Sequence, residues 1–339
     1  MPMIVRLHAF GGPEQLRVEE LPSQRPGRGE ARLRVLATGL SRDQFTFMQG
    51  HHFRGHGFVQ PDLPSRIGYE ACGVVDAVGD DVDPGWVGKR VAPVAPFDQN
   101  QYGVLGEEAV VPAAALCECP TNLTSAQGAA FWVSYLTAWP LVSIGRVGRG
   151  DFVSITAASS AVALAATQIA RDAGAGINAV TRTSKKADHL RALGADHVVV
   201  TESEDYAARV AQITGGRGVR VTFDAIGGPF LESLAEAASP LGIIIEYGRM
   251  SGQPTPFPLF PALGKGLTIR GYTVSEVVSD PGALAEARPY IIDRLTDGRF
   301  VPQVARTFSL GQLAGAYRYI ETNEQLGRVV IEMPPRQDS

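Results

Sequence analysis

The chain has 339 residues, enough for two domains with separate hydrophobic cores. A formal net charge of −4 gives no reason to expect a nucleic-acid partner, and a hydrophobic share of 45% argues against disorder. The three cysteines lack the spacing of a disulfide framework or metal finger, the start of the chain shows no signal-peptide pattern, and no apolar run is long enough to span a membrane. These features favour a soluble cytoplasmic protein.

Short strand patterns separated by glycine and proline occupy the first part of the chain and predict a β-rich domain. Strands are expected at 4–9, 16–21, 31–38, 87–94 and 107–112, with further strand signals from 68 to 82. A loop or short helix is expected between Gly39 and Gly50. The loop that follows carries His51, His52 and His56, which we interpret as solvated side chains, with adventitious metal binding as the alternative.

The stretch 151–182 predicts a strand, a turn of small residues, a helix over 161–173 and a second strand. A βαβ unit of this length is typical of dinucleotide binding, because the N–H groups at the start of the helix can face a pyrophosphate. The glycine fingerprint is degraded, since its three positions hold Ala158, Ser160 and Ala163. The Ser160 hydroxyl could donate to a phosphate oxygen or obstruct it. A βαβ unit without a nucleotide is therefore the alternative.

The end of the second strand favours NADP over NAD. An NAD site places an acid about 20 residues after the glycine turn, where it binds the ribose 2′-hydroxyl. No acid occurs there, and Arg182 and Lys186 could instead hold a 2′-phosphate, with Ser184 as a donor. A solvated basic turn is the alternative.

Strand and helix patterns alternate after residue 176 and predict a parallel, doubly wound sheet. The strands are expected at 177–181, 197–201, 219–225, 242–248 and 267–273, and the helices near 185–193, 205–214 and 230–238. A further helix is expected at 281–297. A strand at 304–308, a helix near 310–322 and a strand at 329–333 would complete the first domain, and the tail 334–339 is polar.

Several motifs resemble those of the medium-chain dehydrogenase/reductase superfamily. Gly68-x-Glu70-x2-Gly73-x5-Gly79-x2-Val82 is similar to the alcohol dehydrogenase signature G-H-E-x2-G-x5-G-x2-V, with Tyr69 in place of His. Further matches lie at 128–139, 193–196, 215–228 and 327–330. The resemblance implies an α/β protein. It has a GroES-like β-barrel catalytic domain, 1–124 and 289–339, and a Rossmann NADP-binding domain with a doubly wound parallel sheet, 125–288.

The positions that ligate zinc in metal-dependent members hold Ser41, Tyr69 and an apolar residue near 132–133 in this chain. Neutral Ser and Tyr cannot form the usual catalytic zinc site, and the four-Cys structural lobe is missing because 98–110 contains no Cys. The chain therefore resembles most closely the zinc-independent quinone oxidoreductase and enoyl reductase branch, and no metal is expected.

This resemblance implies an NADPH-dependent oxidoreductase that reduces a quinone or the C=C of an α,β-unsaturated carbonyl by hydride transfer. The branch often has Asn, Asp and Tyr after the third strand, where Ser41, Gln44 and Thr46 align here. The candidate catalytic residues are Ser41, Gln44, Tyr69 and Tyr135. The candidate cofactor-binding residues are Thr137, Ala158, Ser159, Ser160, Ala161, Val162, Arg182, Ser184, Lys186, Gly248, Tyr272 and Arg328.

Two other functions stay open on the sequence alone. One is a redox-neutral or binding member of the same fold with a degraded nucleotide site. The other is a zinc-type alcohol dehydrogenase with substituted ligands. The sequence does not identify the substrate.

The stretch 267–273 is expected to be the last strand of the sheet and alternates apolar and polar residues. An exposed edge strand is a template for pairing with another chain. We therefore expect a homodimer with 255–275 near its two-fold axis. A monomer whose edge is covered by its own loop is the alternative.

Overall fold

A computed structural model describes residues 1–51, 59–95 and 97–335 of the chain. It divides into two compact units, Met1–Val133 with Val301–Ser339, and Ser134–Phe300. The sequence predicted domain boundaries after residues 124 and 288, whereas the two units divide after Val133 and after Phe300. Of the histidines singled out above, His52 and His56 lie outside the described residues, and His51 is exposed.

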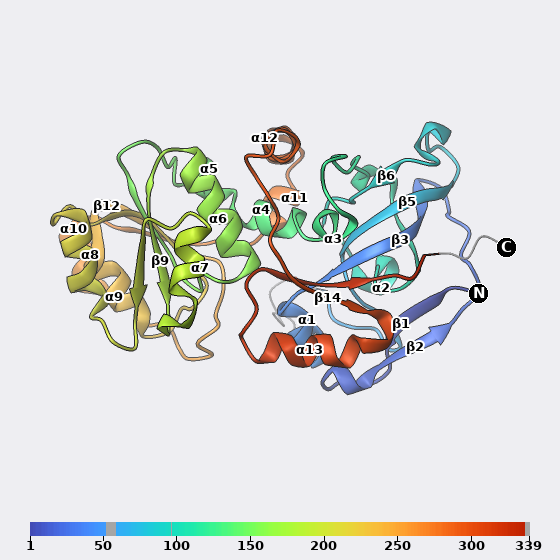
Figure 1. Cartoon of the computed structure of the whole chain (residues 1–339), viewed down its shortest axis with the longest axis horizontal. Helices are drawn as coiled ribbons and strands as arrows, with labels where there is room; N and C mark the ends of the chain where they lie inside the picture. Colours follow the sequence, from blue (N-terminus) through green and yellow to red (C-terminus); the bar gives the residue numbers. More distant parts are fainter. Residues whose placement is uncertain (52–58, 96, 336–339) are drawn as a thin grey trace. The chain divides into compact units, whose positions relative to one another are not determined.

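The first unit is built on two sheets (Figure 1). The larger has the order β14-β15-β3-β5-β6, and β7 pairs with β3 beside this path; the smaller has the order β2-β1-β4. Their strands are β1 (Met3–Leu7), β2 (Leu16–Glu20), β3 (Glu30–Leu40), β4 (Ser65–Arg66), β5 (Glu70–Val78), β6 (Arg90–Val91), β7 (Glu108–Pro112), β14 (Val304–Ser309) and β15 (Arg328–Glu332). The β-rich first domain is thus confirmed, and the two C-terminal strands join it as expected.

Helices of the first unit are short except for one. They are α1 (Asp43–Met48), α2 (Gln99–Tyr102), α3 (Ser125–Gly128) and the longer α13 (Leu313–Glu321). The inward face of α13 packs Tyr317 and Ile320 into the same core as Leu33 and Val35 of β3 and Phe47 of α1. Burying this apolar surface fixes the turn between β3 and α1, where candidate residues lie.

The second unit contains the predicted parallel sheet, in the order β10-β9-β8-β11-β12-β13 (Figure 1). Every neighbouring pair is parallel. Its strands are β8 (Phe152–Ile155), β9 (Gly176–Thr181), β10 (His197–Val200), β11 (Val219–Asp224), β12 (Ala238–Glu246) and β13 (Thr268–Gly271). Apolar strand centres such as Val153, Ile177 and Phe223 are fully or almost fully buried, as expected for a sheet covered on both faces.

Helices α6 and α7 lie on one side of this sheet, and α8 and α9 lie on the other (Figure 1). The helices of the unit are α5 (Pro140–Ser143), α6 (Ala161–Asp172), α7 (Ala187–Ala192), α8 (Tyr206–Thr214), α9 (Phe230–Ala237), α10 (Leu259–Lys265), α11 (Ser275–Val278) and α12 (Pro281–Thr296); α4 (Trp132–Ala138) spans the junction of the units. None of the helices in the described part of the chain combines the length and apolarity needed to cross a membrane.

The strand order reverses between β8 and β11, because the chain adds β9 and β10 on one side of β8 and returns to add β11, β12 and β13 on the other. Ligands of doubly wound sheets bind at such a switch point, outside the carboxyl ends of the strands. A nucleotide would therefore bind at the turn after β8 and the ends of β11 and β12.

Candidate active site

Three polar side chains of the first unit, Ser41, Asp43 and Tyr69, form one hydrogen-bonded group, called here the Asp43 cluster. Ser41 and Asp43 lie in the turn between β3 and α1, and Tyr69 directly precedes β5, which pairs with β3. The Tyr69 hydroxyl lies 2.6 Å from Asp43 Oδ1 and 2.7 Å from Oδ2, and the Ser41 hydroxyl also donates to Asp43. One carboxylate thus accepts both hydroxyl groups.

The Tyr69 phenol is 5% exposed. Burial raises the pKa of Tyr69 well above its ordinary value, and the negative charge of Asp43 raises it further. The phenol therefore keeps its proton at neutral pH and serves as a hydrogen-bond donor rather than as an anion.

Gln44 holds the backbone of the turn that carries the Asp43 cluster. Its Oε1 accepts the Ser41 N–H at 3.0 Å and the Tyr317 hydroxyl at 3.0 Å, and its side chain is fully buried. Its buried Nε2 has no hydrogen-bond partner among the residues that the structure describes. The structure thus brings three of the predicted catalytic residues, Ser41, Gln44 and Tyr69, into one place.

Asp43 was missed by the sequence analysis. The comparison with the branch's motif pointed to Ser41, Gln44 and Thr46 and did not include Asp43, which lies between Ser41 and Gln44. Thr46 donates to the Asp43 carbonyl oxygen and stabilises the first turn of α1. An acid between two site candidates, Ser41 and Gln44, was the signal that could have identified Asp43.

Glu70 and Arg328 form a buried ion pair beside this cluster, with Arg328 Nη2 2.7 Å from Glu70 Oε2. Glu70 Oε1 accepts the Val133 N–H at 3.0 Å, and Arg328 Nη1 donates to the Leu40 carbonyl at 3.3 Å. Burial raises the pKa of Glu70, while the guanidinium acts in the opposite direction. The structure therefore places Arg328, a predicted cofactor-binding residue, in an ion pair that ties β15 to β3 and β5.

The three cysteines are free and buried. Across residues 1–51, 59–95 and 97–335, no group of three or more His, Cys, Asp or Glu side chains could hold a metal ion.

In the second unit, the turn after β8 is closed by Ser160, the N-cap residue of α6. Ser160 has an extended backbone (φ −72°, ψ 155°), so no glycine is required, and its Oγ accepts the Ala163 N–H at 3.2 Å. The Ser160 hydroxyl also lies within hydrogen-bonding reach of the Tyr247 phenol, so its proton can be donated to that phenol or to a ligand. The N–H groups of Ala161 and Val162 precede the first intrahelical hydrogen bond and are without a helical partner.

Lys186 follows β9 in sequence and contacts this turn, with its Nζ 3.0 Å from the Ser159 Oγ. Arg182 is 76% exposed and lies 3.6 Å from Glu202 Oε1, and Ser184 begins a short 3-10 helix. A cation, hydroxyl groups and helix N–H groups therefore lie at the turn, and these donors suit the phosphates of a dinucleotide. The residues present fit a dinucleotide.

Two acids, Asp224 and Glu246, lie side by side in register at the carboxyl ends of β11 and β12. Asp224 accepts the Gly227 N–H at 2.7 Å, the Ile226 N–H at 3.1 Å and the Thr156 hydroxyl. Burial, together with the Asp224 carboxylate, raises the pKa of Glu246 to about 9. Its buried Oε1 has no hydrogen-bond partner within the described ranges. The sequence analysis did not single out this pair.

The remaining candidates lie in the second unit. The Tyr135 hydroxyl donates to Gln168 Oε1 at 2.9 Å and its ring stacks on Phe300, and the Tyr272 hydroxyl donates to the Leu136 carbonyl at 2.7 Å. Thr137 is buried. Gly248 is sterically required, because a Cβ there would lie 2.7 Å from the Ala225 carbonyl oxygen. The assignment of catalytic and cofactor roles to all these residues stays a prediction.

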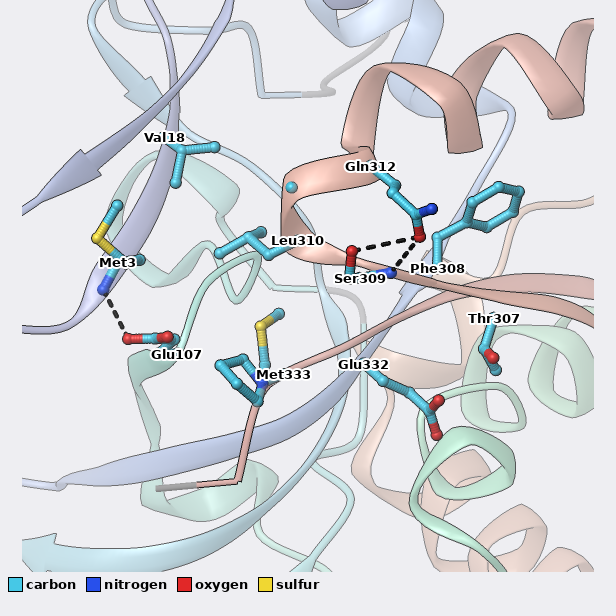
Figure 2. A pocket seen from close by; sticks show the side chains of 12 residues that line it. Met3, Val18, Glu107, Thr307, Phe308, Ser309, Leu310, Gln312, Glu332 and Met333 are labelled. Atoms are coloured by element: carbon cyan, nitrogen blue, oxygen red, sulfur yellow. Dashed lines mark hydrogen bonds between the residues drawn. The ribbon is translucent and has the colours of Figure 1, made fainter. Parts of the chain in front are cut away.

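A separate pocket of 620 Å³ lies in the first unit between the ends of β1, β14 and β15 (Figure 2). Met3, Leu310 and Met333 contribute apolar side chains, and the Met3 N–H donates to Glu107 Oε2 at 2.9 Å. Its lining includes none of the predicted site residues.

Comparison with known proteins agrees with the two-unit structure. Residues 27–122 match the model of the alcohol dehydrogenase GroES-like domain, and residues 161–288 match that of the zinc-binding dehydrogenase domain. A 2-haloacrylate reductase of a Burkholderia species is 30% identical over 98% of this chain and 99% of that protein. A quinone oxidoreductase of Pseudomonas aeruginosa is 27% identical over 96% of this chain and 98% of that protein.

The structure is similar to that of Escherichia coli quinone oxidoreductase complexed with NADPH, with a TM-score of 0.85 and 25% identity over 97% of this chain and 99% of that one. The family expected from the sequence motifs is thereby confirmed, and so is the GroES-like and Rossmann architecture. The chain belongs to the medium-chain dehydrogenase/reductase superfamily, in its zinc-independent quinone oxidoreductase and enoyl reductase-like branch.

Proposed function

We propose that the protein is an NADPH-dependent oxidoreductase that reduces a quinone or the C=C of an α,β-unsaturated carbonyl by hydride transfer, without zinc. The observation that carries this proposal is the Asp43 cluster. Ser41 and Tyr69 occupy the positions of the Cys and His ligands, and their hydroxyl groups are both held by one carboxylate. This donor set suits hydrogen bonding to a substrate oxygen far better than coordination of zinc.

NADPH would bind at the turn after β8 and would supply the hydride when bound. The N–H groups of Ala161 and Val162 and the Ser160 hydroxyl would hold the pyrophosphate. Lys186 lies against this turn through Ser159, and Arg182 follows the same strand, so both are suited to a 2′-phosphate. The relative solved with NADPH supports the choice of cofactor.

An enone or quinone that accepts a hydride develops negative charge on its oxygen. Hydrogen-bond donors placed at that oxygen lower the barrier. The Tyr69 and Ser41 hydroxyl groups can turn from Asp43 toward the oxygen, while the fully buried Gln44 holds the Ser41 backbone in place. Because its pKa is raised, Tyr69 would stabilise the oxygen through a hydrogen bond while keeping its proton.

We further propose that the protein is a homodimer paired through β13. This strand is the edge of the parallel sheet, and large apolar side chains in the segment that precedes it in sequence are exposed: Phe257 at 62%, Phe260 at 83% and Leu263 at 72%. Light scattering should give twice the mass of the 36.1 kDa chain, and Ile269→Lys should weaken association. A single-chain mass at micromolar concentration would reject the dimer.

The direct test is a screen of purified, EDTA-treated protein for NADPH consumption with a panel of quinones and enones. We expect turnover with at least one class and a higher kcat/KM with NADPH than with NADH. Saturable NADPH binding without turnover on any of these substrates would instead favour a binding or redox-neutral role.

A further inference from the structure

The formal charge of the Asp43 cluster and its neighbours is negative. Within the described part of the first unit, the charged side chains that act on the Tyr69 phenol are Asp43 and Arg328. The Arg328 guanidinium is already paired with Glu70 at 2.7 Å and bonded to the Leu40 carbonyl. Two carboxylates against one guanidinium leave one negative charge, and it lies on Asp43.

The nearest arginine in sequence does not compensate this charge. Arg42 directs its Nη2 to the Ile320 carbonyl and to Asn323 Oδ1, both at 2.7 Å, and so points to the end of α13. The partners of Asp43 in these contacts are therefore the hydroxyl groups of Ser41 and Tyr69, and neither of them is a cation.

A substrate carboxylate would meet this arrangement poorly. Carbonyl and carboxylate oxygens both accept hydrogen bonds, so the Tyr69 and Ser41 hydroxyl groups do not by themselves separate the two substrate classes. The charge does separate them, because a substrate carboxylate would bring a second negative charge into a partly buried site, where like charges repel more strongly than in water. The carbonyl of a ketone, amide or quinone carries no such charge.

We propose that Asp43 is a specificity-determining residue that selects uncharged α,β-unsaturated carbonyls or quinones against α,β-unsaturated carboxylates. This inference rests on the proposed function, since it concerns which acceptor that site takes. Asp43 has this effect through its charge, while its hydrogen bonds with Tyr69 and Ser41 fix its position.

The test compares two probes with the same C=C, 2-chloroacrylamide and 2-chloroacrylate, as NADPH-dependent substrates. We expect the native protein to prefer the amide by about tenfold or more in kcat/KM. Asp43→Asn keeps an acceptor oxygen for Tyr69 and removes the charge, so the preference should fall by about tenfold. Because the measured quantity is a ratio, a general loss of activity cancels.

Two further variants separate charge from structure. Asp43→Glu retains the charge and should retain the preference for the amide. Asp80→Asn removes an exposed carboxylate just beyond the far end of β5, roughly 30 Å from Tyr69 along that strand, and should leave the ratio unchanged. Thermal unfolding establishes that each variant is folded, and Asp43→Ser is a second uncharged variant if Asp43→Asn is unstable.

The outcomes distinguish the inference from the function on which it rests. Reduction of both probes with equal kcat/KM, or an unchanged ratio in folded Asp43→Asn or Asp43→Ser, would overturn the inference while the proposed function stands. Failure of the native protein to reduce either probe or any quinone would overturn both.

Discussion

Replacing Glu246 by Gln should remove a pH-dependent loss of stability. The pKa of Glu246 is raised from an ordinary value of 4.5 to about 9, because the carboxyl is largely buried and faces Asp224 across the β11–β12 pair. The unfolded chain therefore releases this proton near pH 4.5, whereas the folded protein holds it until about pH 9. Between these values the unfolded state gains stability relative to the folded state as the pH rises.

The size of the effect follows from the width of this window. Each pH unit inside it costs the folded state at most about 1.4 kcal/mol, so the limit between pH 5 and pH 8 is about 4 kcal/mol. Since the side chain keeps some contact with solvent, which screens the charges, we expect about half of this limit, or about 2 kcal/mol. Glu246→Gln stays neutral and has no such slope.

Urea denaturation at pH 5, 6.5 and 8 measures this difference in the free energy of unfolding. The native protein should lose stability relative to Glu246→Gln as the pH rises. Glu286→Gln, which removes an exposed carboxyl from α12 of the same unit, should follow the native protein. Parallel pH profiles for the native protein and Glu246→Gln would refute the account of the two acids.

Three other predictions concern the turn after β8 and the Glu70–Arg328 ion pair. Lys186→Ala should raise the KM for NADPH by about tenfold and that for NADH much less, because a charge-assisted bond to the 2′-phosphate is lost; equal effects in steady-state kinetics would remove this role. Ser160→Ala should lower the free energy of unfolding by about 1 kcal/mol and Ser160→Gly by a few tenths, and thermal unfolding checks this order. Both variants lose the hydroxyl that caps α6, but glycine, without a Cβ, leaves the first helix N–H groups open to water. Arg328→Gln should cost about 3–5 kcal/mol of stability in urea denaturation by leaving Glu70 buried and unpaired; weaker NADPH binding at unchanged stability would instead make Arg328 a cofactor contact.

The sequence predicted the parallel sheet because its strands are continuous apolar runs separated by helical periodicity. It also located the turn after β8, but it could not decide what Ser160 does there. That answer depends on the backbone dihedral angles, which make Ser160 an N-cap residue with an extended backbone rather than a glycine substitute.

Side-chain pairs between distant parts of the chain were harder to predict. Asp43 meets Tyr69 only because β3 and β5 pair with Gly39 opposite Glu70, and Asp224 meets Glu246 only through the register of β11 and β12. A single sequence shows each acid but not its partner across the sheet. The same limit applies to Arg328, whose pairing with Glu70 depends on β15 joining β3.

The central claim is hydride transfer from NADPH to an activated C=C or a quinone without zinc. The most direct measurement uses metal-free protein, NADPH deuterated at the transferred position of C4, and an enone that the enzyme reduces. We predict that the product carries the deuterium on its β-carbon and that added zinc changes neither rate nor labelling. A product without deuterium, or activity that appears only after zinc is restored, would contradict the account.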